Sequence, residues 1–436
     1  MPKLKHITNW GNFPKIKAQE FKLRNTDNSQ EFFNCKTIIP RGNARCYGDA
    51  SLNSSVVSTL PLKHFINFNS KKGYITCESG VLFSDILEFI VPKGFFLPVT
   101  PGTKFITVGG AIAADIHGKN HHNEGCFSEF VIEFKLLTAQ HTIITCSRTE
   151  NEKLFWETIG GMGLTGVILS ATFQLKPIKT SYIKQESIKA KNLDEVFQLF
   201  ETHEDSTYTV AWIDCLKKGN DLGRSILIRG DHAAPSDLSK KQLEKPLKIH
   251  SSGKLKIPFF FPSFALNTFT VKVFNLLYYF KQFHKTTASV VHYDSFFYPL
   301  DAIHQWNKIY GKNGFIQYQF VVDKARSKAA MKEVLEAISK SGQGSFLAVL
   351  KLFGKQNIKA FNSFPIEGYT LALDFKLNKK VLQLIPILDA IILKYEGRIY
   401  RAKDSCSNPK LTNYVTAHNP KFDSIQNKRI KSHKTI

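Results

Sequence analysis

Short runs of β-branched and aromatic residues, separated by turns, dominate the chain between about Lys36 and Leu175. Such runs are typical of strands, which we predict over Val131–Thr138, Thr142–Cys146 and Val167–Leu175. Apolar residues spaced three and four apart predict a helix over Val81–Pro92, and a second helix is predicted over Asn151–Ile159. The first part of the chain is therefore predicted to mix short strands with short helices.

The pattern changes after about Ser181. Amphipathic helices such as Asn192–Thr202 now alternate with strands, which we predict over Tyr208–Ile213, Phe315–Val322, Ser345–Leu352 and Tyr369–Phe375. An α+β block accounts for this alternation. Because 436 residues exceed what one core usually holds, two domains are expected.

Composition narrows the class of protein. With 43% hydrophobic residues the chain can bury a substantial core. Its seven cysteines are scattered without a C-x-x-C pair, which favours reduced thiols over a disulfide or zinc framework. The first forty residues lack the apolar stretch of a cleavable signal, so we expect a cytoplasmic protein.

The net charge of +23 is compatible with a nucleic acid, an anionic membrane surface or an anionic substrate as partner. No stripe alternates aromatic with basic residues as a single-strand binder requires, so we expect no nucleic-acid partner. An anionic substrate or a membrane surface accounts for the charge better.

The segment Pro101–His122 carries the strongest chemical signal. Paired glycines, Gly109 and Gly110, precede small residues that include Ala113, and the segment closes on three histidines. Glycines let a backbone approach a bulky ligand, and exposed backbone N–H groups suit an anionic group such as a pyrophosphate. This segment is therefore predicted to cradle a cofactor.

Two other interpretations of these motifs are rejected. Gly161, Gly163 and Gly166 match the dinucleotide fingerprint G-x-G-x-x-G, but a helix precedes and a strand follows, which is the reverse of a Rossmann-type NAD site. His117 and His121 have the i, i+4 spacing of metal ligands, yet Gly118 and Asn120 weaken a helix there. No cysteine or carboxylate completes a ligand set, and no metal site is predicted.

Four stretches, Arg41–Asp49, Pro101–His122, Leu154–Gly166 and Gly397–Ser405, together resemble the flavin-binding core of the vanillyl-alcohol oxidase/p-cresol methylhydroxylase superfamily. The amino-acid sequence of the second stretch is most similar to that of the decaprenylphosphoryl-ribose 2'-oxidase branch. The matches keep their order from about Arg41 to Tyr414. The resemblance implies a two-domain α+β fold of the PCMH type: a FAD-binding domain of residues 1–181 completed by 395–436, and a substrate domain with an antiparallel sheet, residues 182–394.

The resemblance implies a set of residues that contact FAD. They are Arg41, Gly42, Asn43, Ala44, Arg45, Cys46, Tyr47, Gly48, Thr103, Val108, Gly109, Gly110, Ala113, His117, Gly118, Asn120, Gly163, Gly166, Tyr400 and Lys403. Related aldonolactone oxidases often attach their flavin through a histidine in the first of these loops. Arg45-Cys-Tyr contains none, so we expect FAD to be held non-covalently.

Lys403 is the strongest catalytic candidate, with Tyr47 and His117 beside it. As an ammonium, Lys403 would stabilise a reduced, anionic flavin; as a neutral amine, it would be a base, which requires a depressed pKa. Both roles remain open from the sequence. The resemblance places further residues in the substrate pocket: Lys119, Trp212, Gln317, Gln319, Lys351 and Asp374.

By resemblance, the substrate is a polyprenyl-phosphate-linked pentose oxidised at C2, and a separate reductase of the SDR type would complete an epimerisation. The alternatives are an aldonolactone oxidase that acts on a small soluble lactone, and a basic binding protein without activity. One departure from the branch is Ala372, where the mycobacterial-type enzymes carry a cysteine before the Val-Asp-Phe motif. It is therefore in question whether the substrate pocket of this chain is identical to that of the mycobacterial-type enzymes.

Ile257–Phe280 is the most apolar stretch of the chain. Pro258, Pro262, Asn267 and Lys272 interrupt it, so it is not expected to span a membrane. We expect a buried segment of the second domain. The alternative is a flap that contacts a membrane or holds a polyprenyl chain, because lysines flank the stretch at 245, 248, 254, 256, 281 and 285. In that case the enzyme would lie peripherally at the inner face of the cell membrane.

Overall fold

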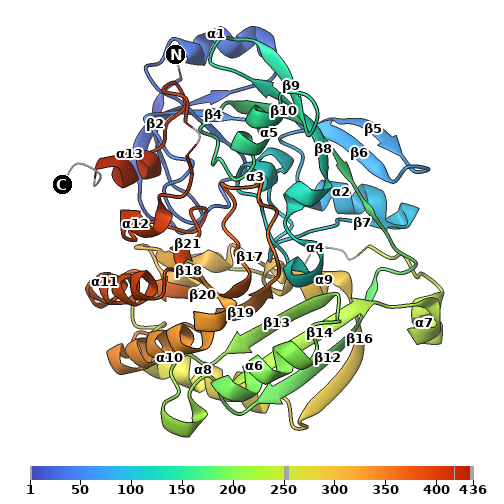
Figure 1. Cartoon of the computed structure of the whole chain (residues 1–436), viewed down its shortest axis with the longest axis vertical. Helices are drawn as coiled ribbons and strands as arrows, with labels where there is room; N and C mark the ends of the chain where they lie inside the picture. Colours follow the sequence, from blue (N-terminus) through green and yellow to red (C-terminus); the bar gives the residue numbers. More distant parts are fainter. Residues whose placement is uncertain (1, 250–254, 417, 433–436) are drawn as a thin grey trace.

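The computed structural model describes residues 2–249, 255–416 and 418–432 (Figure 1). Lys254, one of the lysines that flank the apolar stretch, and residues 433–436 of the predicted C-terminal return lie outside these ranges.

Two sheets build the predicted FAD-binding domain. The first has the order β1 (Leu4–Ile7), β2 (Ile16–Lys22), β4 (Ser55–Ser58), β3 (Ile39–Arg41). The second is antiparallel, in the order β5 (Phe65–Asn69), β6 (Tyr74–Glu78), β10 (Val167–Gln174), β8 (Val131–Leu137), β9 (Ile143–Ser147). The predicted strands β8, β9 and β10 are confirmed to within a residue at either end.

Short helices pack against these sheets. They are α1 (Gln30–Phe33), α2 (Phe83–Ile90), α3 (Val108–Ala113) and α5 (Glu152–Thr158), whereas α4 (His121–Glu124) lies against β19 (Ala348–Phe353) of the second part. Both predicted helices, α2 and α5, are present. A two-stranded ribbon of β7 (Phe95–Phe96) and β11 (Lys176–Pro177) leads the chain toward the second part of the molecule.

An eight-stranded sheet, antiparallel throughout, forms the second part. Its order is β16 (Thr286–His292), β12 (Tyr182–Ala190), β14 (Ser225–His232), β13 (Tyr208–Ile213), β19 (Ala348–Phe353), β20 (Gly368–Lys376), β18 (Phe315–Asp323), β21 (Arg398–Ile399). The predicted strand over Ser345–Leu352 begins three residues later. The α+β fold with an antiparallel substrate-domain sheet is thus confirmed.

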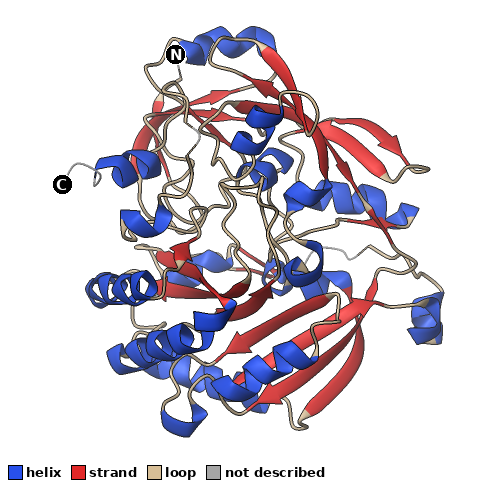
Figure 2. Cartoon of the chain, viewed as in Figure 1, coloured by secondary structure: helices blue, strands red, loops and turns tan. Residues whose placement is uncertain are grey.

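Helices cover one face of this sheet (Figure 2). They are α6 (Leu193–Thr202), α10 (Lys324–Ser341) and α11 (Lys379–Lys394), each started by a side chain that caps it: Asn192, Asp323 and Asn378. Their apolar residues share a core with alternate residues of the strands, such as Leu350 and Leu371. The other set of alternate residues is therefore left to face the predicted FAD-binding domain.

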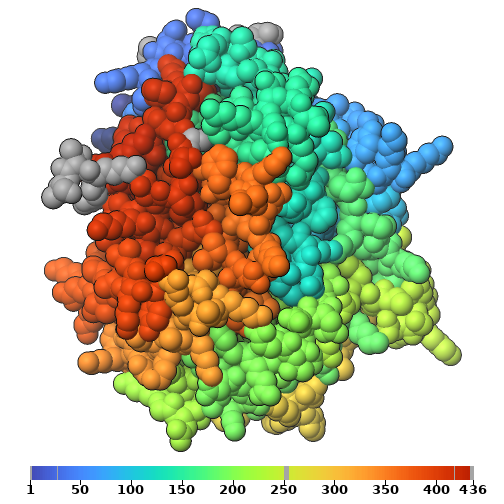
Figure 3. All heavy atoms as spheres, in the orientation of Figure 1, coloured from blue at the N-terminus to red at the C-terminus, as the bar shows by residue number. Residues whose placement is uncertain are grey.

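The C-terminal segment returns to the first sheet. After β21 come α12 (Pro409–Thr412) and α13 (Ile425–Ser432), and Ile38 N donates to Lys421 O at 2.9 Å. The segment around Asn362 also bridges the two parts, since its Nδ2 donates to Glu157 O at 3.0 Å (Figure 3). The domain limits at residues 181 and 394 stay a prediction.

The apolar stretch Ile257–Phe280 is not buried, so our first interpretation of it was wrong. Helix α8 (Thr268–Phe280) buries Val271 and Asn275, whereas Phe264 and Phe269 are about three-quarters exposed, at 75% and 74%. Hydropathy measures how apolar a segment is, but not which side of it faces the protein. Among the described residues, no helix is both long enough and apolar enough to cross a membrane.

Candidate active site

Helix α3 and the loops around it form the predicted cofactor cradle. Thr107 caps the helix, and its Oγ1 accepts a hydrogen bond from Gly110 N at 3.2 Å. A Cβ on Gly42 would lie 2.2 Å from the same oxygen, so glycine is required where the first loop crosses the start of the helix. Gly109 N donates to Ser79 O at 2.8 Å and ties a third segment to this point.

The second glycine-rich loop closes the other end of α3. Met162 N donates to Ala113 O at 2.8 Å, and Gly163 has a left-handed backbone with φ of 76°. A Cβ on Gly166 would lie 2.8 Å from Leu137 O, which explains the glycine at the start of β10. The glycines of this motif therefore serve a close approach of backbones and not a Rossmann turn.

The two arginines of the first loop differ in role. The Arg41 guanidinium is buried and donates to Thr8 O at 2.6 Å, to Ser51 O at 3.3 Å and to Asn9 Oδ1, so it supports the loop from within. Arg45 lies 4.0 Å above the centre of the Trp10 ring. Of the two, Arg45 is better placed to meet a diphosphate.

Tyr47 and Lys403, two of the predicted catalytic residues, lie together. The Lys403 Nζ is 3.7 Å from the centre of the Tyr47 ring, a cation–π contact. Tyr47 N donates to Ala402 O at 3.0 Å, and a Cβ on Gly48 would lie 1.7 Å from Asp404 O. The first loop and the C-terminal motif are thus in direct backbone contact.

Except for Lys119, which lies in the loop before α4, the predicted substrate residues share one face of the eight-stranded sheet. Strand register pairs Gln317 with Asp374, Gln319 with Ala372, and Trp212 with Val349, two residues before Lys351. Paired residues point to the same side of a sheet, and this side is opposite to the helices. The sheet therefore presents a polar patch to the loops that carry Tyr47 and Lys403.

Two side-chain networks order this patch. Gln317 Nε2 donates to Asp374 Oδ1. Gln319 Nε2 lies 3.1 Å from His117 Nε2 and 3.3 Å from Thr370 Oγ1, which assigns the acceptor role to that imidazole nitrogen. His117 also packs edge-on against Phe353, with ring centres 4.8 Å apart.

Burial shifts the titration of this cluster. It lowers the pKa of Lys403 to about 7; the Asp374 carboxyl raises that pKa and Lys351 lowers it. Burial likewise raises the pKa of Asp374 to about 7 and lowers the pKa values of Lys119 and Lys351 to about 7 and about 8. Clusters of groups that titrate near neutrality are typical of active sites.

The three histidines have different surroundings. Burial lowers the pKa of His117 well below its usual value and that of His121 to about 3, so both are neutral. His122 instead contacts Ser206 O at 2.9 Å through Nε2. No group of three potential ligands gathers among the residues that the structure describes.

The remaining predicted residues hold the site together. Tyr400 Oη donates to Ala114 O at 2.9 Å, Asn120 Nδ2 to Pro98 O at 2.8 Å, and Asn43 Nδ2 to Phe105 O at 2.8 Å. Thr103 Oγ1 accepts from Phe105 N at 3.3 Å, and Lys119 Nζ donates to Phe296 O. Ala44 has a left-handed backbone, with φ of 53°. Cys46 Sγ lies 3.1 Å from Ser51 Oγ. Val108, the first residue of α3, is buried in the protein core. The backbone of Gly118 lies against that of Thr100.

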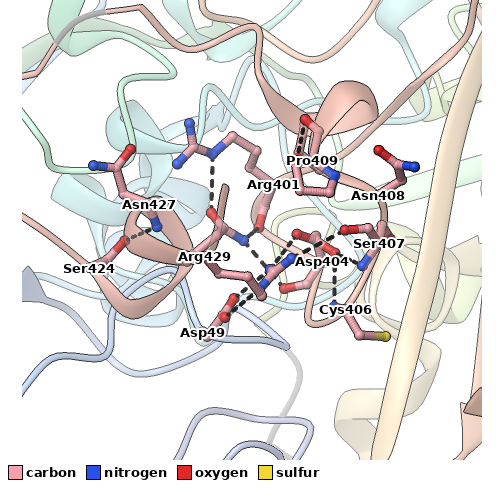
Figure 4. A network of polar contacts seen from close by, with 12 residues as sticks. Asp49, Arg401, Asp404, Cys406, Ser407, Asn408, Pro409, Ser424, Asn427 and Arg429 are labelled. Atoms are coloured by element: carbon pink, nitrogen blue, oxygen red, sulfur yellow. Dashed lines mark hydrogen bonds and ion pairs between the residues drawn. The ribbon is translucent and has the colours of Figure 1, made fainter. Parts of the chain in front are cut away.

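The sequence analysis missed one part of the site, a clamp made by Arg429 of α13 (Figure 4). Its Nε and Nη2 each lie 3.1 Å from a carboxylate oxygen of Asp49, and Nη2 lies 2.7 Å from Asp404 Oδ2. Asp49 ends the loop of Tyr47, and Asp404 follows Lys403. One guanidinium therefore joins the loop that carries Tyr47 to the segment that carries Lys403, a pairing for which the basic sequence around Arg429 gave no signal.

Comparisons with known proteins agree with this geometry. Residues 34–147 match the family model described as an FAD binding domain. The chain is 37% identical to decaprenylphosphoryl-beta-D-ribose oxidase of Mycolicibacterium smegmatis, over 84% of this chain and 80% of the relative. It is 30% identical to an uncharacterised protein of Streptomyces coelicolor, over 75% and 89%. Bovine L-gulonolactone oxidase is 28% identical over 33% of this chain and 31% of its own.

The residues around α3 fit an FAD. Buried polar atoms normally find a partner, yet Ser79 Oγ, Ser405 Oγ and His117 Nδ1 have none within the described protein. All three belong to the segments that make the cradle and the catalytic motif. A bound cofactor with polar edges, together with a substrate beside it, would supply the missing partners.

We expect Arg429→Met to weaken the enzyme in two ways. Losing one partner of a buried ion-pair network costs about 3 kcal/mol or more of unfolding free energy, because both carboxylates are almost fully buried. Loosening the loops should also slow reduction of the bound flavin by substrate. Urea unfolding of the holoprotein and stopped-flow absorbance measure the two effects.

The control is Arg326→Met, because Arg326 pairs with Glu396 on the exposed surface and its loss should leave both measurements nearly unchanged. Arg429→Lys keeps the charge without the two-pronged geometry of the guanidinium. Its unfolding free energy and its rate of flavin reduction should lie between those of wild type and Arg429→Met. Equal unfolding curves for the Arg429→Met and Arg326→Met variants would refute the clamp.

Proposed function

Because the chain belongs to the family of FAD-dependent oxidoreductases that includes decaprenylphosphoryl-beta-D-ribose oxidase, we propose that it oxidises a polyprenyl-phosphate-linked ribose at C2. The product would be a 2-keto sugar, which a separate reductase of the SDR type would reduce to complete an epimerisation. Non-covalent FAD and a peripheral contact with the membrane belong to the same proposal.

One observation carries the proposal: the meeting of Lys403, Tyr47 and Asp374 where the loops of the FAD-binding region touch the polar face of the sheet. Gln317 and Gln319 add amides on that face, which suit the hydroxyl groups of a sugar. The half-buried Lys351 is our candidate partner for the phosphate of the substrate.

The chemistry divides between cofactor and protein. When bound, FAD supplies the acceptor, at N5, for the hydride that leaves the sugar carbon. The amine of Lys403 accepts the proton of the sugar hydroxyl, a role for which a pKa near 7 is suited. Neutral His117, fixed by Gln319, hydrogen-bonds the sugar and so helps to hold the reacting carbon in place.

Anaerobic addition of polyprenylphosphoryl ribose to the yellow holoprotein tests the proposal directly. We expect the visible absorbance of the flavin to bleach as the sugar is oxidised. An aldonolactone should leave the spectrum unchanged, because the loop Arg41–Gly48 lacks the histidine of many lactone oxidases. Bleaching by the lactone alone would reassign the enzyme to that class.

Lys403→Ala should keep its FAD but lose most of its reduction by substrate. General acid–base groups typically contribute 10²–10⁴-fold, so the rate constant should fall by roughly 10²-fold or more. Stopped-flow absorbance under nitrogen measures it, and the unchanged flavin spectrum shows that the fold is intact. Lys410→Ala, which removes an exposed lysine seven residues away, is the matched control. Reduction at the wild-type rate would remove Lys403 from the mechanism.

The rate of flavin reduction should rise with pH through about 7, because the neutral amine of Lys403 is the form that accepts a proton. The Asp374 carboxyl raises the pKa of this lysine, so Asp374→Asn should move the inflection to lower pH. Single-turnover rates between pH 5.5 and 9 for both proteins provide the comparison. A rate that falls over this range would instead assign Lys403 the role of a stabilising cation.

A further inference from the structure

Helix α8 carries its apolar side chains on the outside. Phe269, Val273, Leu277 and Phe280 recur every three to four residues and all are exposed. The inward side instead holds Asn275, whose Nδ2 donates to Asp214 Oδ1 at 2.8 Å. An amphipathic helix at a protein surface normally has the opposite orientation, with its apolar stripe toward the core.

The segments on both sides extend this surface. We define the α8 face as the exposed apolar residues Phe259, Phe260, Phe264, Phe269, Val273, Phe274, Leu276, Leu277, Phe280 and Phe283. Exposed apolar side chains scattered singly are ordinary, whereas ten along twenty-five residues mark a binding surface.

The charge around the α8 face indicates what it binds. The sequence from 245 to 293 contains seven lysines and no aspartate or glutamate. Of the described lysines, Lys285 pairs with Glu195 of α6, and Lys281 lies 3.6 Å above the ring of Tyr278. An apolar centre with a basic rim matches an anionic bilayer, which offers hydrocarbon below a layer of negative headgroups.

The α8 face is continuous with the wall of the proposed substrate site. The ring of Tyr278 lies 4.6 Å from that of Trp212, which stands on the polar face of the sheet. Lys376, two residues after Asp374, donates from Nζ to Leu266 O at 3.2 Å. The apolar surface thus begins where the predicted sugar site ends.

We propose that the α8 face docks the enzyme on an anionic membrane and so places the substrate site next to the headgroup layer. This inference rests on the proposed function, because a lipid-linked sugar keeps its apolar tail in the bilayer. Docking then brings the sugar to Lys403 without extracting the whole lipid into water, which is unfavourable because every CH₂ of the tail would be exposed.

Flotation with vesicles tests the docking. Wild-type holoprotein should float with vesicles of phosphatidylglycerol and phosphatidylcholine, float far less with phosphatidylcholine alone, and be released by high salt. The double variant Phe269→Glu/Leu277→Glu should bind the anionic vesicles roughly tenfold or more weakly, because it puts two charges on the apolar stripe. Ile387→Glu, at an exposed position of α11, should bind as wild type does.

Flavin reduction by a short-chain, water-soluble prenylphosphoryl ribose separates this inference from the proposed function. The double variant should retain the wild-type rate with that substrate and lose rate only with long-chain substrate in vesicles. If wild type reduces its flavin with the short substrate but does not float, the membrane proposal is refuted and the function stands. If the double variant instead changes the molecular mass of the protein in light scattering, the α8 face is an interface between two copies.

Discussion

The approach of the Gly48 backbone to the carbonyl of Asp404 is the constraint on which the rest of the site depends. A side chain at position 48 would collide with that oxygen, so only glycine lets the first loop touch the C-terminal motif. The contact sets Tyr47 beneath Lys403, and the hydrogen bond from Tyr47 N to Ala402 O fixes the register of the two segments. Arg429 then forms ion pairs with Asp49 of the first loop and with Asp404 of the C-terminal motif.

The electrostatics of the site follow from this packing. Three half-buried lysines, Lys119, Lys351 and Lys403, belong to the same site as the buried carboxyl of Asp374, and desolvation lowers the pKa values of the lysines. A cluster with more cations than anions in a region of low dielectric is stabilised by an anionic ligand. The diphosphate of FAD and the phosphate of the proposed substrate both carry the negative charge that such a cluster favours.

Local patterns predicted the strands and the glycine motifs because each depends on neighbouring residues. The strand predicted over Tyr208–Ile213 is β13 at the predicted bounds, and the resemblance singled out Lys403 and Tyr47, which the structure places in contact. Two features depend on distant partners and escaped this reasoning. Arg429 meets Asp49 across 380 positions of sequence. Helix α8 is as apolar as a core helix, and only the burial of Val271 and the hydrogen bond from Asn275 to Asp214 show which side faces inward.

The long reach of Arg429 also bears on how the protein is made. A ribosome synthesises the first loop early, and it synthesises α13 only after all strands of the eight-stranded sheet. Until then Asp49 has no guanidinium partner from α13, and Lys403 has not been added to the chain. Contacts between such distant segments form late in folding. A growing chain therefore contains α3 and both glycine-rich loops well before it contains the residues that complete the site.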